Sequence, residues 1–265
     1  MTTLRSLVFN ALFYLNLIGQ LLVLSPIFFV VPERLTWRFL KNWARSSLWL
    51  LRHVAGLDAK MIGRENIPAG PAIVASKHQS FWDIVALVPE LDKPTFILKR
   101  ELMLIPFFGW FAGRLKMIPV ERGRGGAAIP EMLKKAREAV ADGRQIVIFP
   151  EGTRTAPGAD PGYRSGVFRL YRELALPVVP VALNSGLYWP RRQFIRRPGT
   201  VVAAFLPPIQ PGLERDVFLS RLRQAIEGRS VDLLREAYRD QPDLPVSPEV
   251  SARLADPLKA SAEAG

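Results

Sequence analysis

Residues 72–83 of this 265-residue chain read AIVASKHQSFWD, and this stretch decides the fold. Its first part, Ala72 to Ser76, is a short apolar run of the kind that forms a strand buried on both faces of a sheet. The polar residues that follow predict a turn, and the residues from Phe81 to Val88 predict a helix. A buried strand followed at once by a helix is the repeating unit of α/β proteins.

The same alternation continues along the chain. Other short apolar runs predict strands at 95–98, 116–120, 145–149, 177–183 and 200–206. Longer mixed segments predict helices at 129–141, 166–174 and 216–238. We therefore expect an α/β domain over residues 59–239, with a mostly parallel sheet covered by helices on both faces. Residues 240–265 are rich in Pro, Ser and Ala without periodicity, so we expect a flexible tail there.

The N-terminal segment, residues 1–58, indicates association with a membrane. No charged residue lies between Ser6 and Pro32, and the 25 residues from Leu7 to Val31 are long enough to cross a bilayer core of about 30 Å. Four residues interrupt this run: Asn10, Asn16, Gln20 and Pro26. Two shorter helices that dip into one leaflet therefore fit as well as one spanning helix. A buried core helix is the plainer alternative, whereas a secretory signal fits poorly because no small-residue cleavage site follows.

Residues 36–53 predict a basic amphipathic helix. Five apolar residues recur at three- and four-residue steps: Trp37, Leu40, Ala44, Leu48 and Leu51. Arginine and lysine gather on the adjoining face, and three tryptophans are typical of a segment at an anionic leaflet. The same stripe would also fit a helix packed on a soluble core. Because this segment directly follows the apolar run, we favour a membrane as its neighbour. The arginine excess predicts the cytoplasmic side, and we expect a bacterial inner membrane.

Composition limits the classes of chemistry and of partner. The net charge of +12 favours a negatively charged partner: nucleic acid, an anionic membrane or a phosphorylated substrate. The absence of cysteine excludes disulfides, thiolate nucleophiles and sulfur-ligated zinc. Of the two histidines, we interpret His53 as structural or interfacial. His78 and Asp83 would give a metal only two ligands, with no third at suitable spacing, so we expect no metal site.

His78 and Asp83 are five residues apart and would point about 140° apart on one continuous helix. They meet only if His78 lies in the turn after the strand and Asp83 within the helix. In that geometry the carboxylate holds the imidazole in one tautomer and stabilises the imidazolium, which predicts a general base. The same spacing also arises by chance, in which case His78 is a plain polar residue.

Three other predicted strands end in cations. Lys99 follows the second strand, Arg122 the third, and Arg154 the fourth, after Glu151, Gly152 and Thr153. Because the carboxyl ends of parallel strands meet at one edge of a sheet, we expect these cations to lie beside His78. Cations gathered at one edge suit a phosphate group. Each of them alone would also fit a solvated surface charge.

Four blocks in this order resemble the glycerolipid acyltransferase family, whose bacterial members acylate lysophosphatidic acid (1-acyl-sn-glycerol-3-phosphate). The blocks are His78 to Asp83 (H-x4-D), Gly113 to Arg122, Glu151 to Arg154 (E-G-T-R) and Val178 to Val181. Lys99 followed by Glu101-Leu102 is also similar to many members. The resemblance covers the chain from about residue 60 to residue 210, and the apolar N-terminus fits it too.

The resemblance implies a mechanism that agrees with the residues. His78 takes a proton from a glycerol hydroxyl, Asp83 orients the ring, and the alkoxide attacks the thioester of acyl-CoA or acyl carrier protein. Lys99, Arg122 and Arg154 hold the substrate phosphate, while Glu151, Gly152 and Thr153 shape the loop. The expected product is phosphatidic acid for phospholipid biosynthesis. No cofactor is expected, because the acyl donor is a co-substrate.

Three alternatives remain at this level. Gly123-x-Gly125-x-x-Ala128 matches a loose dinucleotide fingerprint, but we find no acidic residue closing the next strand at the required distance. A non-catalytic lipid- or nucleic-acid-binding protein would keep the basic surface and would not need His78; we expect no nucleic acid. An acyltransferase with another acceptor, such as glycerol 3-phosphate, a lyso-aminolipid or another lysophospholipid, would share all four blocks.

Overall fold

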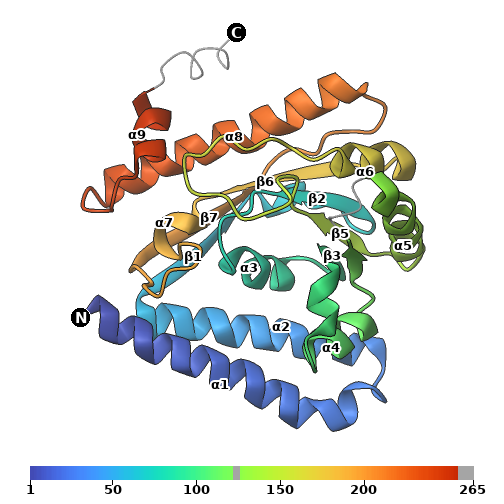
Figure 1. The fold of residues 1–265 in the computed structure, drawn as a ribbon, viewed down its shortest axis with the longest axis horizontal. Coiled ribbons are helices and arrows are strands. Elements are labelled where there is room, and N and C mark those ends of the chain that lie inside the picture. The colour runs from blue at the N-terminus through green and yellow to red at the C-terminus, as the bar shows by residue number, and fades with distance from the viewer. Residues whose placement is uncertain (122–125, 256–265) are drawn as a thin grey trace.

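A computed structural model describes residues 1–121 and 126–255. Its strands are β1 (Leu57–Ile62), β2 (Ala72–Ser76), β3 (Pro94–Lys99), β4 (Ile118–Val120), β5 (Gln145–Ile148), β6 (Val178–Leu183) and β7 (Gly199–Phe205). In the described residues these strands form one sheet in the order β1-β7-β6-β2-β5-β3-β4 (Figure 1). Only β6 and β7 pair in antiparallel fashion within it. The prediction of a mostly parallel sheet is therefore confirmed.

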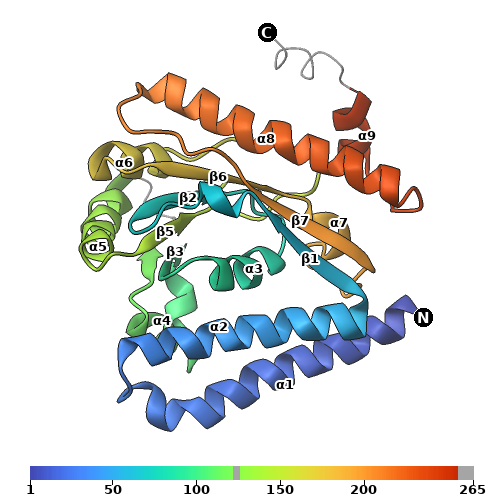
Figure 2. The same ribbon diagram turned by 180° about the vertical axis from the view of Figure 1, so that it is seen from behind.

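Helices cover both faces of the sheet, as predicted. The helices are α1 (Thr2–Phe28), α2 (Glu33–Leu50), α3 (Trp82–Glu90), α4 (Phe108–Arg114), α5 (Ile129–Ala141), α6 (Gly166–Leu174), α7 (Ser185–Tyr188), α8 (Arg215–Asp240) and α9 (Pro248–Ala255). Figures 1 and 2 show α8 over one face and α3 over the other, with α2 and then α1 beyond α3. Shorter helical turns lie at Leu51–Ala55, Arg64–Asn66 and Arg100–Leu104.

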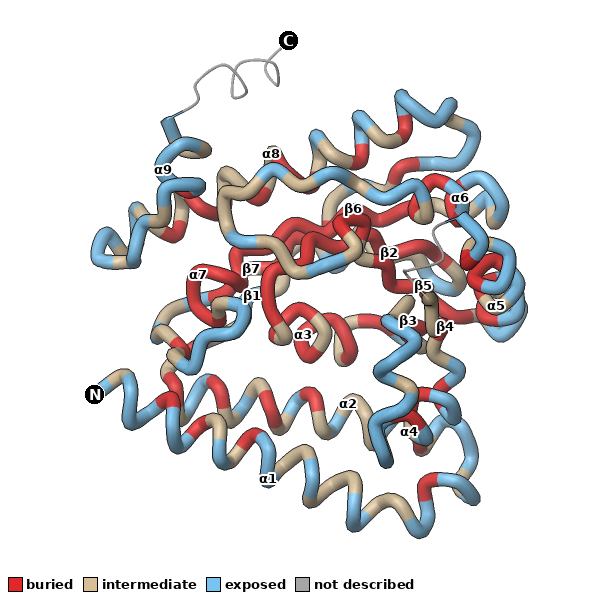
Figure 3. The backbone as a smooth tube through the Cα atoms, in the orientation of Figure 1, coloured by how far each residue is buried: buried red, intermediate tan, exposed pale blue. Residues whose placement is uncertain are grey.

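The core consists of two layers, one on each face of the sheet. Along β2, Val74 packs with the residues of α2 and α3, while Ile73 and Ala75 pack with those of α5, α6 and α8. Successive side chains of a strand point to opposite faces, so a strand covered on both sides must be apolar throughout. Every residue of β2 is buried, and Figure 3 shows the buried centre of the sheet between more exposed outer helices.

The two N-terminal helices form an antiparallel hairpin on the α3 side of the molecule. The α2 stripe faces inward, since Ala44 and Leu51 are buried in the core and Leu40 packs against it. Our preference for a membrane-binding stripe on α2 was therefore wrong: this face covers α3. The polar residues of α1 also face protein, because Asn16 bonds to Ser46 and Ser47 of α2 at 3.0 and 3.1 Å.

The outer face of α1 carries the exposed apolar surface. Leu15 is 66% exposed and Val23 is 75% exposed, although both are apolar. By length and composition α1 is long enough to cross a membrane, with a mean hydropathy of 1.9 in its most apolar window. Pro26 lies in its last turn, so the helix runs unbroken instead of splitting into two.

A buried arginine joins the helical hairpin to the sheet. Arg144, just before β5, is fully buried and donates to Glu33 Oε1 at 2.6 Å and to the Leu115 carbonyl at 2.8 Å. Its guanidinium also lies 5.5 Å from the ring centre of Trp37 on α2. A buried guanidinium requires such pairing, since removing one partner leaves an uncompensated charge. The start of α2 is therefore fixed relative to β5.

Three segments differ from expectation. Strand β1 was not predicted, because its residues are only half-buried at the edge of the sheet. Helix α4 was not predicted either. Within the expected tail, residues 248–255 form α9, whose buried Val250 contacts Gly158; residues 256–265 lie outside the described part.

The four strands whose ends carry the predicted site residues are neighbours. Strands β2, β5, β3 and β4 are adjacent and parallel, so their carboxyl ends meet at one edge. The remaining strands β1 and β7 run together at the far side of β6. The site residues from these four strand ends are thus presented on the same side of the sheet.

Candidate active site

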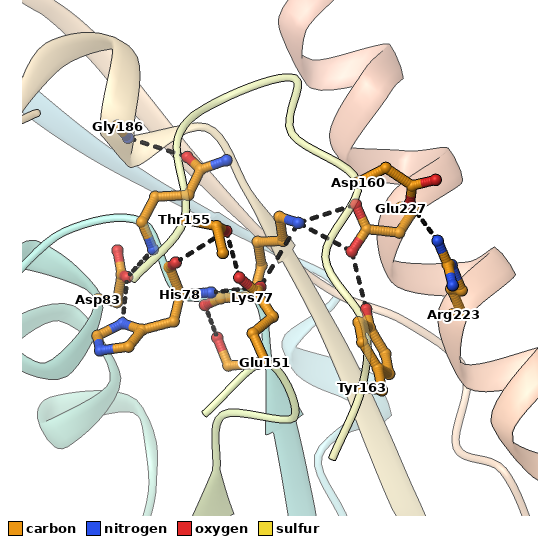
Figure 4. A network of polar contacts seen from close by, with 12 residues as sticks. Lys77, His78, Asp83, Glu151, Thr155, Asp160, Tyr163, Gly186, Arg223 and Glu227 are labelled. Atoms are coloured by element: carbon orange, nitrogen blue, oxygen red, sulfur yellow. Dashed lines mark hydrogen bonds and ion pairs between the residues drawn. The ribbon is translucent and has the colours of Figure 1, made fainter. Parts of the chain in front are cut away.

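His78 and Asp83 meet directly in the turn between β2 and α3. His78 Nδ1 lies 2.8 Å from Asp83 Oδ2, and both side chains are buried or nearly so. Asp83 stands in the first turn of α3, where the amino end of the helix favours an anion. The strand-to-helix geometry expected from the five-residue spacing is therefore the one adopted (Figure 4).

The carboxylate of Asp83 is surrounded by donors. The backbone N–H groups of Gln79 and Ser80 donate to Oδ2 at 2.7 and 2.9 Å, and the Ser185 hydroxyl donates to Oδ1 at 2.5 Å. Hydrogen bonds of this kind favour the charged form of a carboxylate. A charged Asp83 accepts only, so Nδ1 of His78 carries the proton and Nε2 is left as the basic nitrogen.

The backbone of His78 is held from the loop after β5. Its N–H donates to Glu151 Oε1 at 3.0 Å, and its carbonyl accepts from the Thr155 N–H at 2.8 Å. The Thr155 hydroxyl in turn bonds to Glu151 Oε2. Phe149 stacks on the imidazole with ring centres 3.8 Å apart. The imidazole is thus held by the hydrogen bonds of the His78 backbone, by the contact of Nδ1 with Asp83 and by the ring of Phe149 stacked on one of its faces.

Glu151 is a deeply buried carboxylate that contacts the turn between β2 and α3. Burial raises its pKa to about 6, while the ammonium of Lys77 acts in the opposite direction. Lys77 Nζ lies 3.5 Å from Glu151 Oε1 and 2.8 Å from both carboxylate oxygens of Glu227 on α8. Sequence reasoning missed Lys77, Glu227 and Ser185, because their contacts come from distant parts of the chain.

Arg154 lies over the ring of Phe81, which is close in sequence to Asp83; its guanidinium is 5.9 Å from the ring centre. Burial lowers the pKa of Arg154 and the nearby carboxylate of Asp83 raises it, which places the guanidinium within electrostatic reach of that carboxylate. Arg191, from the loop after α7, donates to the Arg154 carbonyl at 2.8 Å and lowers the pKa of Arg154 further. Arg191 is a second cation here that the motifs did not indicate.

The other predicted residues are less tightly placed. Lys99 ends β3, is half-exposed and pairs with Glu101 at 3.0 Å; among the described residues no hydrogen bond or ion pair joins it to His78 or Arg154. Arg122 lies outside the described residues. Gly152 has a φ of 72°, a left-handed conformation that favours glycine, and Thr153 is exposed beside it. The loop shape thus depends on Gly152.

Ser80 lies in the turn between His78 and Asp83. Ser80 is fully buried, and its hydroxyl accepts from the Trp82 N–H at 2.9 Å at the start of α3. Among residues 1–121 and 126–255, no group of three or more His, Cys, Asp or Glu side chains is arranged to hold a metal ion.

Comparisons with known proteins show the family to which the chain belongs. A family model described as acyltransferase matches residues 58–184, the region that contains β2, the catalytic turn and the Glu151 loop. A 1-acyl-sn-glycerol-3-phosphate acyltransferase from Pseudomonas aeruginosa is 35% identical over 82% of this chain and 87% of that protein. One from Saccharomyces cerevisiae is 30% identical over 74% of this chain and 67% of that protein.

The fold has a solved counterpart. The crystal structure of the 1-acyl-sn-glycerophosphate acyltransferase from Thermotoga maritima matches with a TM-score of 0.73 and 21% identity, over 88% of this chain and 98% of that one. Together with the sequence relatives, the fold and the buried His78–Asp83 pair define an enzyme that transfers acyl groups. The chain belongs to the acyltransferase family. Within that family it is similar to the 1-acyl-sn-glycerol-3-phosphate acyltransferases.

Proposed function

We propose that this protein transfers a fatty acyl group from acyl-CoA or acyl carrier protein to the sn-2 hydroxyl of 1-acyl-sn-glycerol-3-phosphate, which yields phosphatidic acid. One observation carries the proposal: His78 has its Nδ1 bound to Asp83 at 2.8 Å and its Nε2 left over as a base. The names of the relatives supply the acceptor. The reaction needs no metal and no bound cofactor.

The proposed reaction has two proton transfers through one nitrogen. Nε2 of His78 takes the hydroxyl proton of the acceptor as the oxygen attacks the thioester carbonyl. The tetrahedral intermediate then collapses, the carbon–sulfur bond breaks, and the thiolate receives the proton from His78. Asp83 stabilises the imidazolium in between, since its negative charge lies 2.8 Å from the ring. No enzyme nucleophile takes part, which suits a chain without cysteine and with a buried Ser80.

Arg154 and Lys99 are proposed to bind the phosphate of the acceptor, together with Arg122. Arg154 lies over the ring of Phe81 within electrostatic reach of Asp83, and Arg191 brings a second positive charge to its carbonyl. A guanidinium can grip a phosphate through two parallel hydrogen bonds, which fixes the orientation of the substrate. Binding of the phosphate at this place would hold the sn-2 hydroxyl near Nε2, and positioning of this kind supplies much of the rate.

The proposed location is the cytoplasmic side of an inner membrane, with α1 lying in one leaflet. Both ends of α1 contact the rest of the protein. Near its start, Ser6 and Asn10 bond to Arg196, at 2.8 and 3.0 Å; at its end, Phe28 stacks on Phe111 of α4 with ring centres 3.8 Å apart. A helix fixed along the domain at both ends, with its apolar face outward, favours a position parallel to the membrane surface.

The position of α1 can be tested by labelling, because the chain has no cysteine of its own. Thr3→Cys places a single thiol in the first turn of α1 and Arg34→Cys places one after its end, both at exposed positions. In inverted membrane vesicles, both should react with a membrane-impermeant maleimide added outside. Labelling of only one of them would mean that α1 crosses the bilayer.

The activity test compares purified wild type with His78→Ala. Labelled acyl-CoA and acylated carrier protein are offered in separate assays with lysophosphatidic acid, and lysophosphatidylcholine serves as the control acceptor. We expect phosphatidic acid from wild type, a loss of several orders of magnitude in the variant, and little transfer to the control acceptor. Full activity of the folded His78→Ala variant would contradict the general-base role. Preference for a different acceptor would replace the proposed substrate and leave the chemistry in place.

A further inference from the structure

Lys77, the residue before His78, is buried between two carboxylates. Its side chain is 2% exposed, and its ammonium lies 2.8 Å from both oxygens of Glu227 and 3.5 Å from Glu151 Oε1. Burying charges is costly, and a buried ion pair often stabilises a fold no better than apolar residues of the same size would. Fold stability alone therefore gives little reason for three charged groups at this place.

The cluster leads from α8 to the catalytic histidine (Figure 4). Tyr163 donates to Glu227 Oε1 at 2.9 Å, Glu227 accepts from Lys77, and Lys77 faces Glu151. Glu151 then accepts from the N–H of His78 at 3.0 Å. The contacts are continuous, and they end on the residue whose ring must be aimed at the substrate hydroxyl.

We propose that Lys77 and Glu227 are positioning residues for acyl transfer: Glu227 holds the Lys77 ammonium in place, and Lys77 holds Glu151 as a carboxylate against the N–H of His78 and so aims the imidazole. The proposal rests on the acyltransferase function proposed above and extends it to residues outside the four sequence blocks. A charged carboxylate holds an N–H more strongly than a neutral carboxyl group does. A ring displaced by about 1 Å can lose about a hundredfold in rate.

Lys77 and Glu227 shift the pKa of Glu151 in opposite directions, because their charges have opposite signs. Burial raises the pKa of Glu151 to about 6, Lys77 lowers it and Glu227 raises it. The other groups that face this cluster are His78, Tyr163 and the Arg223–Asp160 ion pair. Removing the charge of Lys77 must raise the pKa of Glu151, whereas removing that of Glu227 must lower it.

These signs set the expected pH profiles. Glu151 is charged above its pKa, so activity that needs the carboxylate is lost as the pH falls through that pKa. Lys77→Met should therefore move the acid limb of kcat/KM to higher pH. Glu227→Gln should move it to lower pH. A shift of about one pH unit corresponds to about a tenfold change in kcat/KM on the acid side.

The experiment measures kcat/KM for labelled acyl-CoA and lysophosphatidic acid across the acid limb and the plateau. The matched control is Glu236→Gln, which removes a carboxylate from the same helix, where it pairs with Arg229 at 2.7 Å, and should leave the limb unchanged. The shifts of Lys77→Met and Glu227→Gln should also disappear in a Glu151→Gln background. Persistence there would mean that both residues act on the His78 ring directly, which would overturn the proposal.

The outcomes separate this inference from the function on which it rests. No product from wild type would reject the proposed reaction. If wild type is active and both variants have the same acid limb of kcat/KM as wild type, the positioning role is rejected. It is also rejected if both variants move this limb in the same direction. Thermal unfolding will show whether Lys77→Met folds. If it does not, the positioning role is tested with Glu227→Gln, alone and in the Glu151→Gln background, because glutamine keeps the size of the side chain.

Discussion

The two halves of the active site are built differently. Around His78 and Asp83, the chain supplies its own partners: backbone N–H groups, the Ser185 hydroxyl and the ring of Phe149 fix both side chains. On the cationic half, Lys99 is half-exposed and pairs with its neighbour Glu101, and Arg154 meets another cation, Arg191. The His78–Asp83 half is held by buried partners, whereas in the described residues the cationic half is held by one exposed carboxylate and contains a second cation.

The difference follows from what each half must do. A general base must be held in one tautomer before the substrate arrives, so its partners are built into the fold. A phosphate site must keep its donors available, since a guanidinium already paired with a carboxylate would have to break that pair to bind the ligand. Variants in the two halves should accordingly affect different kinetic constants.

Asp83→Asn should have the largest effect and change kcat. The amide cannot accept from every donor around it, and it would favour the wrong tautomer of His78, so we expect a loss of about a thousandfold or more with little change in KM. Steady-state kinetics would measure the loss, with Asp92→Asn, an exposed position just after α3, as the control. A loss seen mainly in KM would remove the distinction between the halves.

Arg154→Ala should have the next largest effect and raise KM for the phosphorylated acceptor. Loss of a charge-assisted hydrogen bond of about 1.5–3 kcal/mol corresponds to a rise of about ten- to a hundredfold. A monoacylglycerol, which lacks the phosphate, should react almost equally well with wild type and variant. An equal loss with both acceptors would show that Arg154 acts on something other than the phosphate.

Arg191→Gln should have the smallest effect, a rise of a few-fold in the same KM that weakens as salt is added. Arg192→Gln is the matched control, because it changes the same residue type at an exposed position of the same loop. Equal effects of the two variants would mean that only the overall charge of the loop matters.

The sequence predicted the central sheet well and its margins poorly. The strand at 72–76 and the helices at 129–141 and 166–174 have the expected bounds, because burial on both faces of a strand and a one-sided helical stripe leave clear patterns. Strand β1 was missed because only Leu57 in it is buried, which is too little for a strand signal. The apolar stripe on α2 was predicted, but sequence periodicity does not show whether such a stripe packs on a protein core or on a membrane.

In the site, local spacing was informative and distant contacts were not. The spacing of His78 and Asp83 predicted a turn and a helix start, and the structure has both. The predicted roles of Lys99 and Arg154 remain predictions, and Arg122 lies outside the described residues. Ser185 and Glu227 could not be found in advance, because they reach the turn only when β6 and α8 have packed beside β2.

The contacts of the turn between β2 and α3 also limit when this turn can be assembled. His78 is bonded to a residue 73 positions later, Asp83 to one 102 positions later, and Lys77 to one 150 positions later. Contacts of such long sequence separation are costly in loop entropy and form late in folding. A nascent chain lacks the last of these partners until α8 has been synthesised. The full set of contacts around the turn can therefore form only after most of the chain has been made.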